Sequence, residues 1–393
     1  MTPPDPEAPA GPFEEIASGA RPIEGVGTAV AAFVGLAEAG PIDVPLLLSD
    51  WSAVEREFGG LSGGSPLARA VHDYFENGGR SAVVVRVGAF GAEAEWQGLA
   101  ALESLPDVNL LVLPDVAAPG TRMPAEAARA VVSEAAAFCE RHRAMLLLDA
   151  PADWTGVDAI EAAAASDDGL AGALGTDSAN AAVYFPRVRT ADPLGGAPVA
   201  VGAAGAVAGV IARTDATRGV WAAPAGTDAA IRGAAGLDVS LKDDELDRVN
   251  RLGVNCLREL PGGSTVVWGA RTLQGADAAG SEWKYVPVRR FVLFLEESID
   301  RGLRWAVFEP NAEPLWQSVR RDVTAFLHGL WRDGAFPGRT PDEAFFVRCG
   351  EDTMTQNDLD NGRLVVEIGI APVRPAEFVI LRIRSHAKPA DDD

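Results

Sequence analysis

Cysteine and histidine are scarce in this chain, and their scarcity limits the chemistry that it can carry. The 393 residues include three cysteines and four histidines, with no C-x-x-C or H-x-x-x-H pair among them. Cys139, Cys256 and Cys349 are odd in number and far apart, which argues against a disulfide framework and suits a reducing compartment. We therefore expect no metal site and no Cys–His dyad.

Basic side chains are also few. Lysine and arginine total 34 against 56 aspartates and glutamates, which gives a formal net charge of −22. Such a surface repels nucleic acid and anionic membranes, so we expect neither as a partner. The acidic excess lies almost wholly in residues 1–283. The near-neutral remainder can pack against copies of itself without strong repulsion.

A long hydrophobic run is missing as well. The longest apolar stretch, Val199 to Ala212, is mostly alanine, glycine and valine, and it falls short of the roughly 18 apolar residues that span a membrane. The N-terminus, "MTPPDPEAPAGPFEE", lacks the basic and apolar regions of a signal peptide. Its first twelve residues hold five prolines, so we expect an extended arm.

Motifs that bind nucleotides or activate nucleophiles are absent or incomplete. "GLSGG" matches the nucleophile-elbow pattern but follows a predicted helix where the elbow needs a strand. "GVGTAV" lacks the third glycine of a dinucleotide fingerprint, and no P-loop occurs. "DLDNG" is followed by Arg363 where a calcium loop needs glycine. We expect no cofactor.

What the chain does contain is the periodicity of an α/β protein. Continuous apolar runs of the buried, parallel type stand at 28–36, 81–87 and 108–115. An Ala-rich helix is predicted between Met123 and Arg143, and the strand "AMLLLDAP" follows it, which gives a β-α-β order. Residues 154–194 are rich in Ala, Asp and Gly, and we expect them to be loose apart from the strand "AAVYFPRV".

The C-terminal third has a clearer pattern. Helices are predicted at 285–301 and 312–332, and "RWAVFEP" between them reads as a strand. The strands "EAFFVRCG", "RLVVEIGIAPV" and "EFVILRIR" follow. The fold class expected is therefore mixed α/β, with an N-proximal α/β domain at 25–270 and a C-terminal α/β domain at 271–376. Extended arms are expected at 1–24 and 377–393.

Glu309 and Glu313 are the candidates for catalysis. Two carboxylates beside Trp305 and Trp316 can act as the acid and base of a hydrolase that cleaves sugars. They also have local structural uses, because Pro310 ends the predicted strand, Asn311 can cap the next helix, and Glu313 then falls in the first turn of that helix. The chain lacks the strand-helix repeats of a barrel enzyme. We favour the structural reading and expect Glu309 to accept hydrogen bonds or to pair with an arginine.

A family resemblance enters with the C-terminal segment. The stretch from "WKYVPVRRFVLFLEESIDRG" through "RWAVFEPNAEPLWQSVRRDVTAFLHGLW" to "RLVVEIGIAPVRPAEFVILRI" resembles the C-terminal domain of contractile tail sheath proteins. These proteins form the sheath of phage tails and of phage-tail-like injection systems. "FEEIASGARPIEGVGTAVAAFVGLAEAGP", "FENGGRSAVVVRV" and "AGVIARTDATRGVWAAPAG" resemble the same family, so the resemblance covers almost the whole chain.

The resemblance implies a structural subunit without catalytic residues. Sheath subunits form six-fold rings stacked around an inner tube, with baseplate and cap proteins at the two ends, and their contraction drives the tube into a target. It also implies assembly in the cytoplasm into a phage tail or a tail-like particle that can be released. A sheath paralogue at the baseplate or cap end is the alternative in the same class.

Arms exchanged between neighbouring subunits are the contacts that the resemblance implies. A terminal apolar strand can pair with an open sheet edge of another copy. Here the proline-rich start departs from the family pattern, and Pro12 shortens the N-terminal strand. The expected arm contacts are Phe13, Glu14, Glu15, Ile16, Phe378, Val379, Ile380, Leu381, Arg382 and Ile383. Arg320, Arg321, Asp322 and Arg332 are candidates for contacts with subunits or the tube, and a solvated helix face is the equal alternative.

Overall fold

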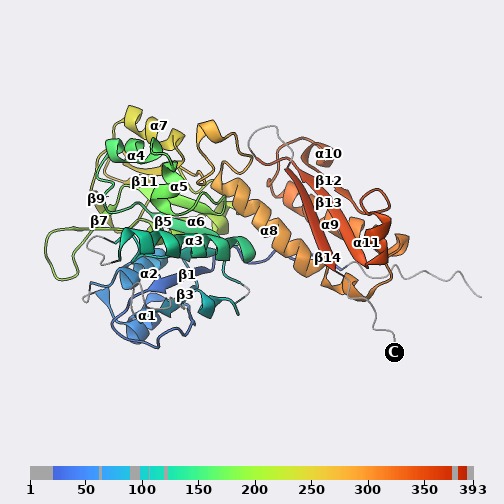
Figure 1. Ribbon diagram of the computed structural model, residues 1–393, viewed down its shortest axis with the longest axis horizontal. Coiled ribbons are helices and arrows are strands. Elements are labelled where there is room, and N and C mark those ends of the chain that lie inside the picture. The colour runs from blue at the N-terminus through green and yellow to red at the C-terminus, as the bar shows by residue number, and fades with distance from the viewer. Residues whose placement is uncertain are drawn as a thin grey trace, which may run out of the picture.

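The computed structural model describes residues 21–61, 64–88, 98–105, 107–118, 123–373 and 379–386, the last of these as backbone only. Figure 1 shows two α/β parts connected through the long helix α8. The N-proximal part is built on a large sheet and the C-terminal part on a small one. The fold class expected from the sequence, mixed α/β, is confirmed.

The large sheet has eight strands in the order β11-β10-β6-β5-β4-β1-β3-β2. Its inner strands are parallel, and β2 and β11 pair antiparallel at the two edges. Because both faces are covered, successive side chains of β1 enter two different hydrophobic clusters. The strands are β1 Ala31–Gly35, β2 Leu46–Leu48, β3 Ala82–Arg86, β4 Leu110–Val112, β5 Met145–Asp149, β6 Ala181–Phe185, β10 Val254–Glu259 and β11 Thr265–Val267.

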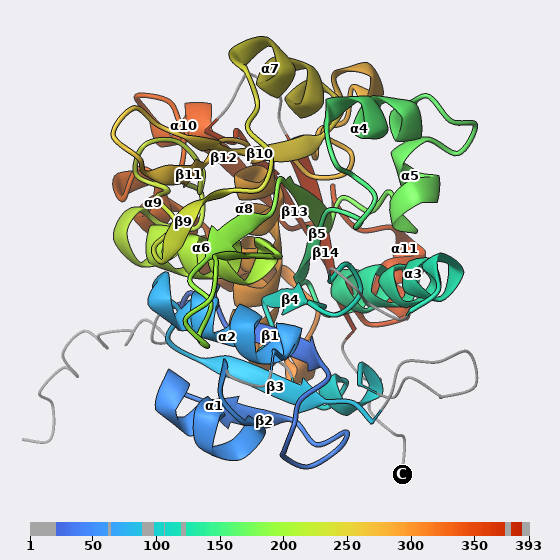
Figure 2. The same ribbon diagram turned by 90° about the vertical axis from the view of Figure 1, so that its left-hand side faces the viewer.

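Helices cover both faces of the large sheet (Figure 2). On one face lie α1, α2 and α6, and on the other α3, α4 and α7. The helices are α1 Trp51–Phe58, α2 Pro66–Glu76, α3 Ala125–Arg141, α4 Val157–Ala164, α5 Gly169–Leu174, α6 Ala204–Arg218 and α7 Asp243–Arg251, with a 3-10 turn, η2, at Ala100–Leu102. Ser65 is the N-cap of α2, since its Oγ accepts from the Ala68 amide at 3.2 Å.

Glycine lets α2 and α6 approach each other closely. A Cβ atom on Gly205 would lie 2.4 Å from the Ala70 carbonyl oxygen, and one on Gly209 would lie 2.4 Å from that of Tyr74. Only glycine fits such a backbone approach without a shift of one helix. The longest apolar stretch, 199–212, begins as a short strand, β8 Val199–Val201, and continues into α6, which is buried on nearly all sides.

The expectation of a loose middle segment is wrong. Residues 154–194 contain α4, α5, β6 and the strand β7 Val188–Thr190. The sequence of α4 and α5 has few large apolar side chains, and the buried ones are Val157, Ile160 and Leu174. A second sheet, in the order β8-β7-β9, closes this region with β9 at Ala234–Leu237.

The C-terminal part packs two long helices against a three-stranded antiparallel sheet in the order β12-β13-β14. Its elements are α8 Val286–Gly302, η4 Arg304–Phe308, α9 Glu313–Arg332, α10 Pro341–Ala344, β12 Phe345–Arg348, α11 Gln356–Asp360, β13 Arg363–Ile370 and β14 Val379–His386, and a turn, η3, lies before them at Asp277–Ala279. None of the helices in the described ranges combines the length and apolar character that crossing a membrane requires.

Two local predictions in this part are wrong. "RWAVFEP" forms the 3-10 helix η4 rather than a strand, because its amides bond three residues back, as in Ala306 N to Leu303 O at 2.9 Å. Ala312, not Asn311, is the N-cap of α9. The Asn311 amide instead accepts from Trp316 Nε1 at 2.7 Å and donates to the Arg363 carbonyl at 3.1 Å, which ties the helix start to β13.

Candidate functional site

Glu309 and Glu313 do not form a catalytic pair. Both are exposed. Glu313 accepts from Arg320 at 2.7 Å and from Gln317 at 3.0 Å, and these hydrogen bonds hold the pKa of its carboxyl below the usual range. A general acid needs a raised pKa. In the described part of the chain, Glu309 has neither the hydrogen bond nor the arginine partner that we expected of it.

The charged residues singled out on α9 differ in exposure. Arg321 and Arg332 are exposed. The alternative of a solvated helix face is wrong for Asp322, because its side chain is 2% exposed and accepts from Arg321 Nε at 3.0 Å. Arg320 is engaged within the subunit, by Glu313 and by the Cys349 carbonyl. Arg321 and Arg332 are thus the two whose charge faces outward.

The predicted N-terminal arm contacts, Phe13 to Ile16, lie outside the described residues, and so does Phe378. The chain becomes described at Arg21, whose guanidinium stacks over the Trp305 ring at 4.5 Å. From there it runs along α8: a Cβ on Gly302 would meet Ile23, and Ser298 Oγ accepts from the Val26 amide at 3.1 Å. The start of the described chain is therefore fixed to the C-terminal end of α8.

The C-terminal strand lies at an edge of the small sheet. All eight residues of β14 pair with β13, from Arg363 opposite His386 to Ile370 opposite Val379. Residues 371–378 connect the two strands, although a two-residue turn can join an antiparallel pair. Val379, Ile380, Leu381, Arg382 and Ile383 therefore occupy a terminal edge strand on a long connection, which is the placement that a strand exchanged between copies needs.

A buried ion pair fixes α8 to the N-proximal part. Arg290 donates two hydrogen bonds to Asp215 on α6, at 2.9 and 2.7 Å, and a third to the Thr28 carbonyl at 2.8 Å. The Thr28 hydroxyl donates to Asp215 at 2.6 Å. The side chains of Arg290 and Asp215 are 4% and 6% exposed. Each polar group of this junction has a partner, which is the condition under which a buried ion pair is stable.

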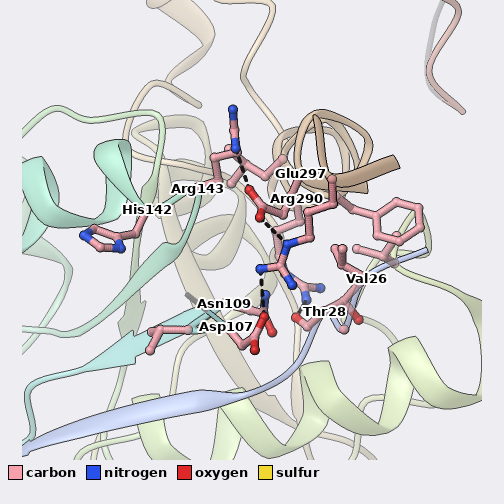
Figure 3. A pocket seen from close by; sticks show the side chains of 14 residues that line it. Val26, Thr28, Asp107, Asn109, His142, Arg143, Arg290 and Glu297 are labelled. Atoms are coloured by element: carbon pink, nitrogen blue, oxygen red, sulfur yellow. Dashed lines mark hydrogen bonds and ion pairs between the residues drawn. The ribbon is translucent and has the colours of Figure 1, made fainter. Parts of the chain in front are cut away.

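A second charged network continues the junction along α8, as Figure 3 shows around a narrow cleft of about 30 Å³. Arg143, after α3, and Arg301, on α8, both bind Glu297 at 2.5 Å, and Arg301 also binds Asp107 at 2.7 Å. Burial alone would raise the pKa of Glu297, but these two hydrogen bonds outweigh it and lower that pKa. Four charges thus clamp the two parts together.

This junction was not predicted from the sequence. Its only signal was Arg290 inside an otherwise apolar helix face, together with Asp215 in the block "ARTDATRG" that resembles the sheath family. A charge within an apolar face predicts a buried partner, but nothing in the sequence says which residue that partner is.

Comparisons with known proteins follow the same two parts. Residues 91–273 match the family model of the phage tail sheath protein central domain, and residues 278–385 match that of the phage tail sheath C-terminal domain. The tail sheath protein of Vibrio phage KVP40 is 27% identical over 189 residues. That match covers 48% of this chain and 27% of the phage protein. The chain thus spans about a quarter of the length of this curated relative.

Solved structures agree over nearly the full length. A chain of the anti-feeding prophage helical sheath in its contracted state is 30% identical, with a TM-score of 0.72, over 95% of this chain and 98% of that one. A chain of the contracted sheath of the PVC extracellular contractile injection system is 28% identical, with a TM-score of 0.73, over 96% and 98%. These matches show that the fold is shared, and with the two family models they show that the chain belongs to the contractile tail sheath family.

Proposed function

We propose that this chain is a sheath subunit that polymerises as stacked six-fold rings around an inner tube and contracts to drive that tube into a target. The observation that carries the proposal is the edge strand β14 on its long connection. The same chain thus offers a strand and the sheet edge that accepts it. The match to contracted sheaths of the anti-feeding prophage and of PVC supports the contractile role.

Strand exchange would cost little in hydrogen bonds. If β14 leaves its own sheet, the β14 of a neighbour can form the same eight pairs with β13, as in domain swapping. An extended connection of eight residues spans up to about 26 Å, which is enough to reach an adjacent copy. The N-terminal contacts, Phe13 to Ile16, would add a second link to another neighbour.

We expect the contacts of the junction to stay fixed during contraction and those of the arms to change. Because buried and clamped charges hold α8 to the N-proximal part, each subunit would move as one body. The arms would then change conformation when the lattice changes, and they would stay linked while the rings rotate and widen. The energy would come from an extended lattice that is less stable than the contracted one. We also propose that the boundary between the N-proximal and the C-terminal domain lies near residue 270.

A variant with a locked strand tests the exchange. Replacing residues 371–378 by Asn-Gly gives the two-residue turn that suits a hairpin of β13 and β14, so β14 can no longer reach a neighbour. Wild-type protein should form hollow tubes of uniform diameter by negative-stain electron microscopy. The locked variant, like a deletion of residues 377–393, should stay unassembled, with its helix content retained in circular dichroism.

The same Asn-Gly pair, inserted elsewhere in the chain, is the control. Two extra residues after Gly262, where nothing lies within 4 Å of an added Cβ, should leave tube formation intact. Tubes formed by the locked variant would contradict strand exchange. If wild-type protein stayed monomeric even with tube protein supplied, the sheath function itself would be wrong.

A paralogue confined to the baseplate is the second candidate. A chain of the anti-feeding prophage baseplate is 28% identical, with a TM-score of 0.72 and coverage of 98% of that chain. Counting copies in purified particles separates the two, since a sheath needs many rings and a paralogue one. In either role we propose that Arg321 and Arg332 face the tube or a neighbour, that the particle assembles in the cytoplasm, and that baseplate and cap proteins bind its ends.

A further inference from the structure

A large aromatic groove lies at the end of α8 opposite to the entry of the described chain. It has a volume of about 820 Å³, in the range of ligand-binding clefts. Trp221, Trp268 and Tyr285 line it and are all partly exposed. Trp221 also packs against the hydrophobic cluster of the C-terminal part, and the Arg258 guanidinium lies over the Trp268 ring at 4.7 Å. Grooves walled by aromatic rings bind proline-rich segments in the polyproline II conformation.

The charged residues that line the groove are three arginines and two aspartates, Asp247 and Asp277, and Asp277 is already paired with Arg271 at 2.8 Å. Arg251 lines it and is exposed, and among the described residues no carboxylate lies within ion-pair distance of its guanidinium. Arg218, also exposed and on the rim, pairs with Asp228 at 3.7 Å, and the side chain of Asp228 is 80% exposed. An acidic segment would therefore find partners beside the aromatic rings.

The N-terminal sequence has the complementary pattern. Pro3, Pro6, Pro9 and Pro12 recur at every third position. A polyproline II helix has three residues per turn, so these four rings share one face. Asp5 and Glu7 fall on the other faces, and no basic side chain occurs before Arg21. The segment thus joins a ridge of prolines to negative charge.

The geometry of α8 points to a second copy as the source of this segment. The described chain runs backwards from Thr28, beside Arg290, to Arg21, beside Trp305. It therefore leaves at the C-terminal end of α8, while the groove lies at the first turns. The 17 residues of α8 separate the two ends by about 25 Å. Residues 1–20 would have to reverse direction to reach the groove of their own subunit.

We infer that the aromatic groove of one subunit binds the proline ridge, Pro3 to Pro12, of a neighbouring subunit. Arg251 and Arg218 pair with Asp5 and Glu7. The arm and the groove are unlike surfaces at opposite ends of α8, so the contact is head-to-tail and extends an open array rather than closing a dimer. The inference rests on the proposed sheath function and adds a specific site to it.

Disulfide trapping tests the contact. Burial raises the pKa of the three native thiols, so the native cysteines should not compete. Full-length Pro9→Cys is co-expressed with full-length Ala223→Cys, which places a thiol at the exposed rim of the groove. The control partner is Ser133→Cys, exposed on α3. After mild oxidation, the linked pair should exceed the control about tenfold, as for a contact worth about 1.4 kcal/mol.

Charge reversal adds a second readout. Arg251→Glu should lower the yield of the linked pair severalfold, and Glu7→Arg in the arm should restore it. A yield equal to that of the control would overturn the inference. So would linkage confined to single chains that carry both Pro9→Cys and Ala223→Cys, because the arm would then occupy its own groove. Tubes seen in these samples without linkage at the groove leave the sheath function standing and refute this contact alone.

Discussion

Asp115 should make the stability of the subunit depend on pH in an unusual direction. It follows β4, is 5% exposed, and accepts from the Leu36 amide at 2.9 Å. Burial raises the pKa of its carboxyl from 3.8 to about 6, and the hydrogen bond only partly opposes this. Above pH 6 the folded protein must therefore hold a buried, ionised carboxylate.

The size of the effect follows from the shift. The unfolded chain ionises Asp115 near its ordinary pKa of 3.8, whereas the folded chain does so near 6. The contribution of this group to stability is therefore full below pH 3.8, falls as the pH rises to 6, and is constant above. The shift of roughly two units corresponds to a loss of about 3 kcal/mol.

Asp115→Asn should remove this loss. The amide oxygen can still accept from Leu36, and the charge is absent, so the variant should gain up to about 3 kcal/mol over wild type at pH 7.5 and little at pH 4. Urea unfolding followed by circular dichroism at several pH values measures the difference, and Asp153→Asn, on an exposed side chain, is the control. A difference between variant and wild type that stays the same from pH 4 to 7.5 would refute the reasoning.

Two further predictions concern the buried ion pair and the packing of glycines in helices. Arg290→Leu leaves the Asp215 carboxylate buried without its partner and should lower the free energy of unfolding by about 3–5 kcal/mol, while Arg290→Leu combined with Asp215→Leu should cost less than the single change. Gly209→Ala should lower it by about 1–3 kcal/mol, because the new methyl group meets the Tyr74 carbonyl. Gly329→Ala, in a helix where nothing lies within 4 Å of the new Cβ, should raise it by about 0.5–1 kcal/mol. Thermal or urea unfolding measures the stability of all these variants. Equal effects of Gly209→Ala and Gly329→Ala would contradict the packing account.

Much of the fold could be predicted because it depends on local patterns. The buried parallel strands and the helices α3, α8 and α9 follow from apolar periodicity, and α1 and α2 begin at the caps Asp50 and Ser65. The wrong predictions concern segments whose apolar pattern fits both a strand and a helical turn. "RWAVFEP" alternates like a strand, yet it directly continues α8 and closes the turn in a 3-10 helix, which leaves Phe308 88% exposed.

The site was harder to predict because its contacts join residues far apart in the chain. Arg290 and Thr28 are 262 positions apart, and Val26 and Ser298 are 272 apart. Asp322 looked like one charge of a solvated face, and only the packing of α9 shows that it is buried. Sequence periodicity defines which face of a helix is apolar, but it does not define which element covers that face.

The position of α8 explains why these long-range contacts matter for assembly. One helix holds the N-proximal part through Arg290, the incoming chain through Ser298, and the aromatic groove at its first turns. Because these contacts lie on one helix, we expect a force on the arm at one end of α8 to reach the groove at the other end without a change inside the subunit. The proposed contraction would need that property, since the arms would have to stay linked while the lattice around each subunit changes.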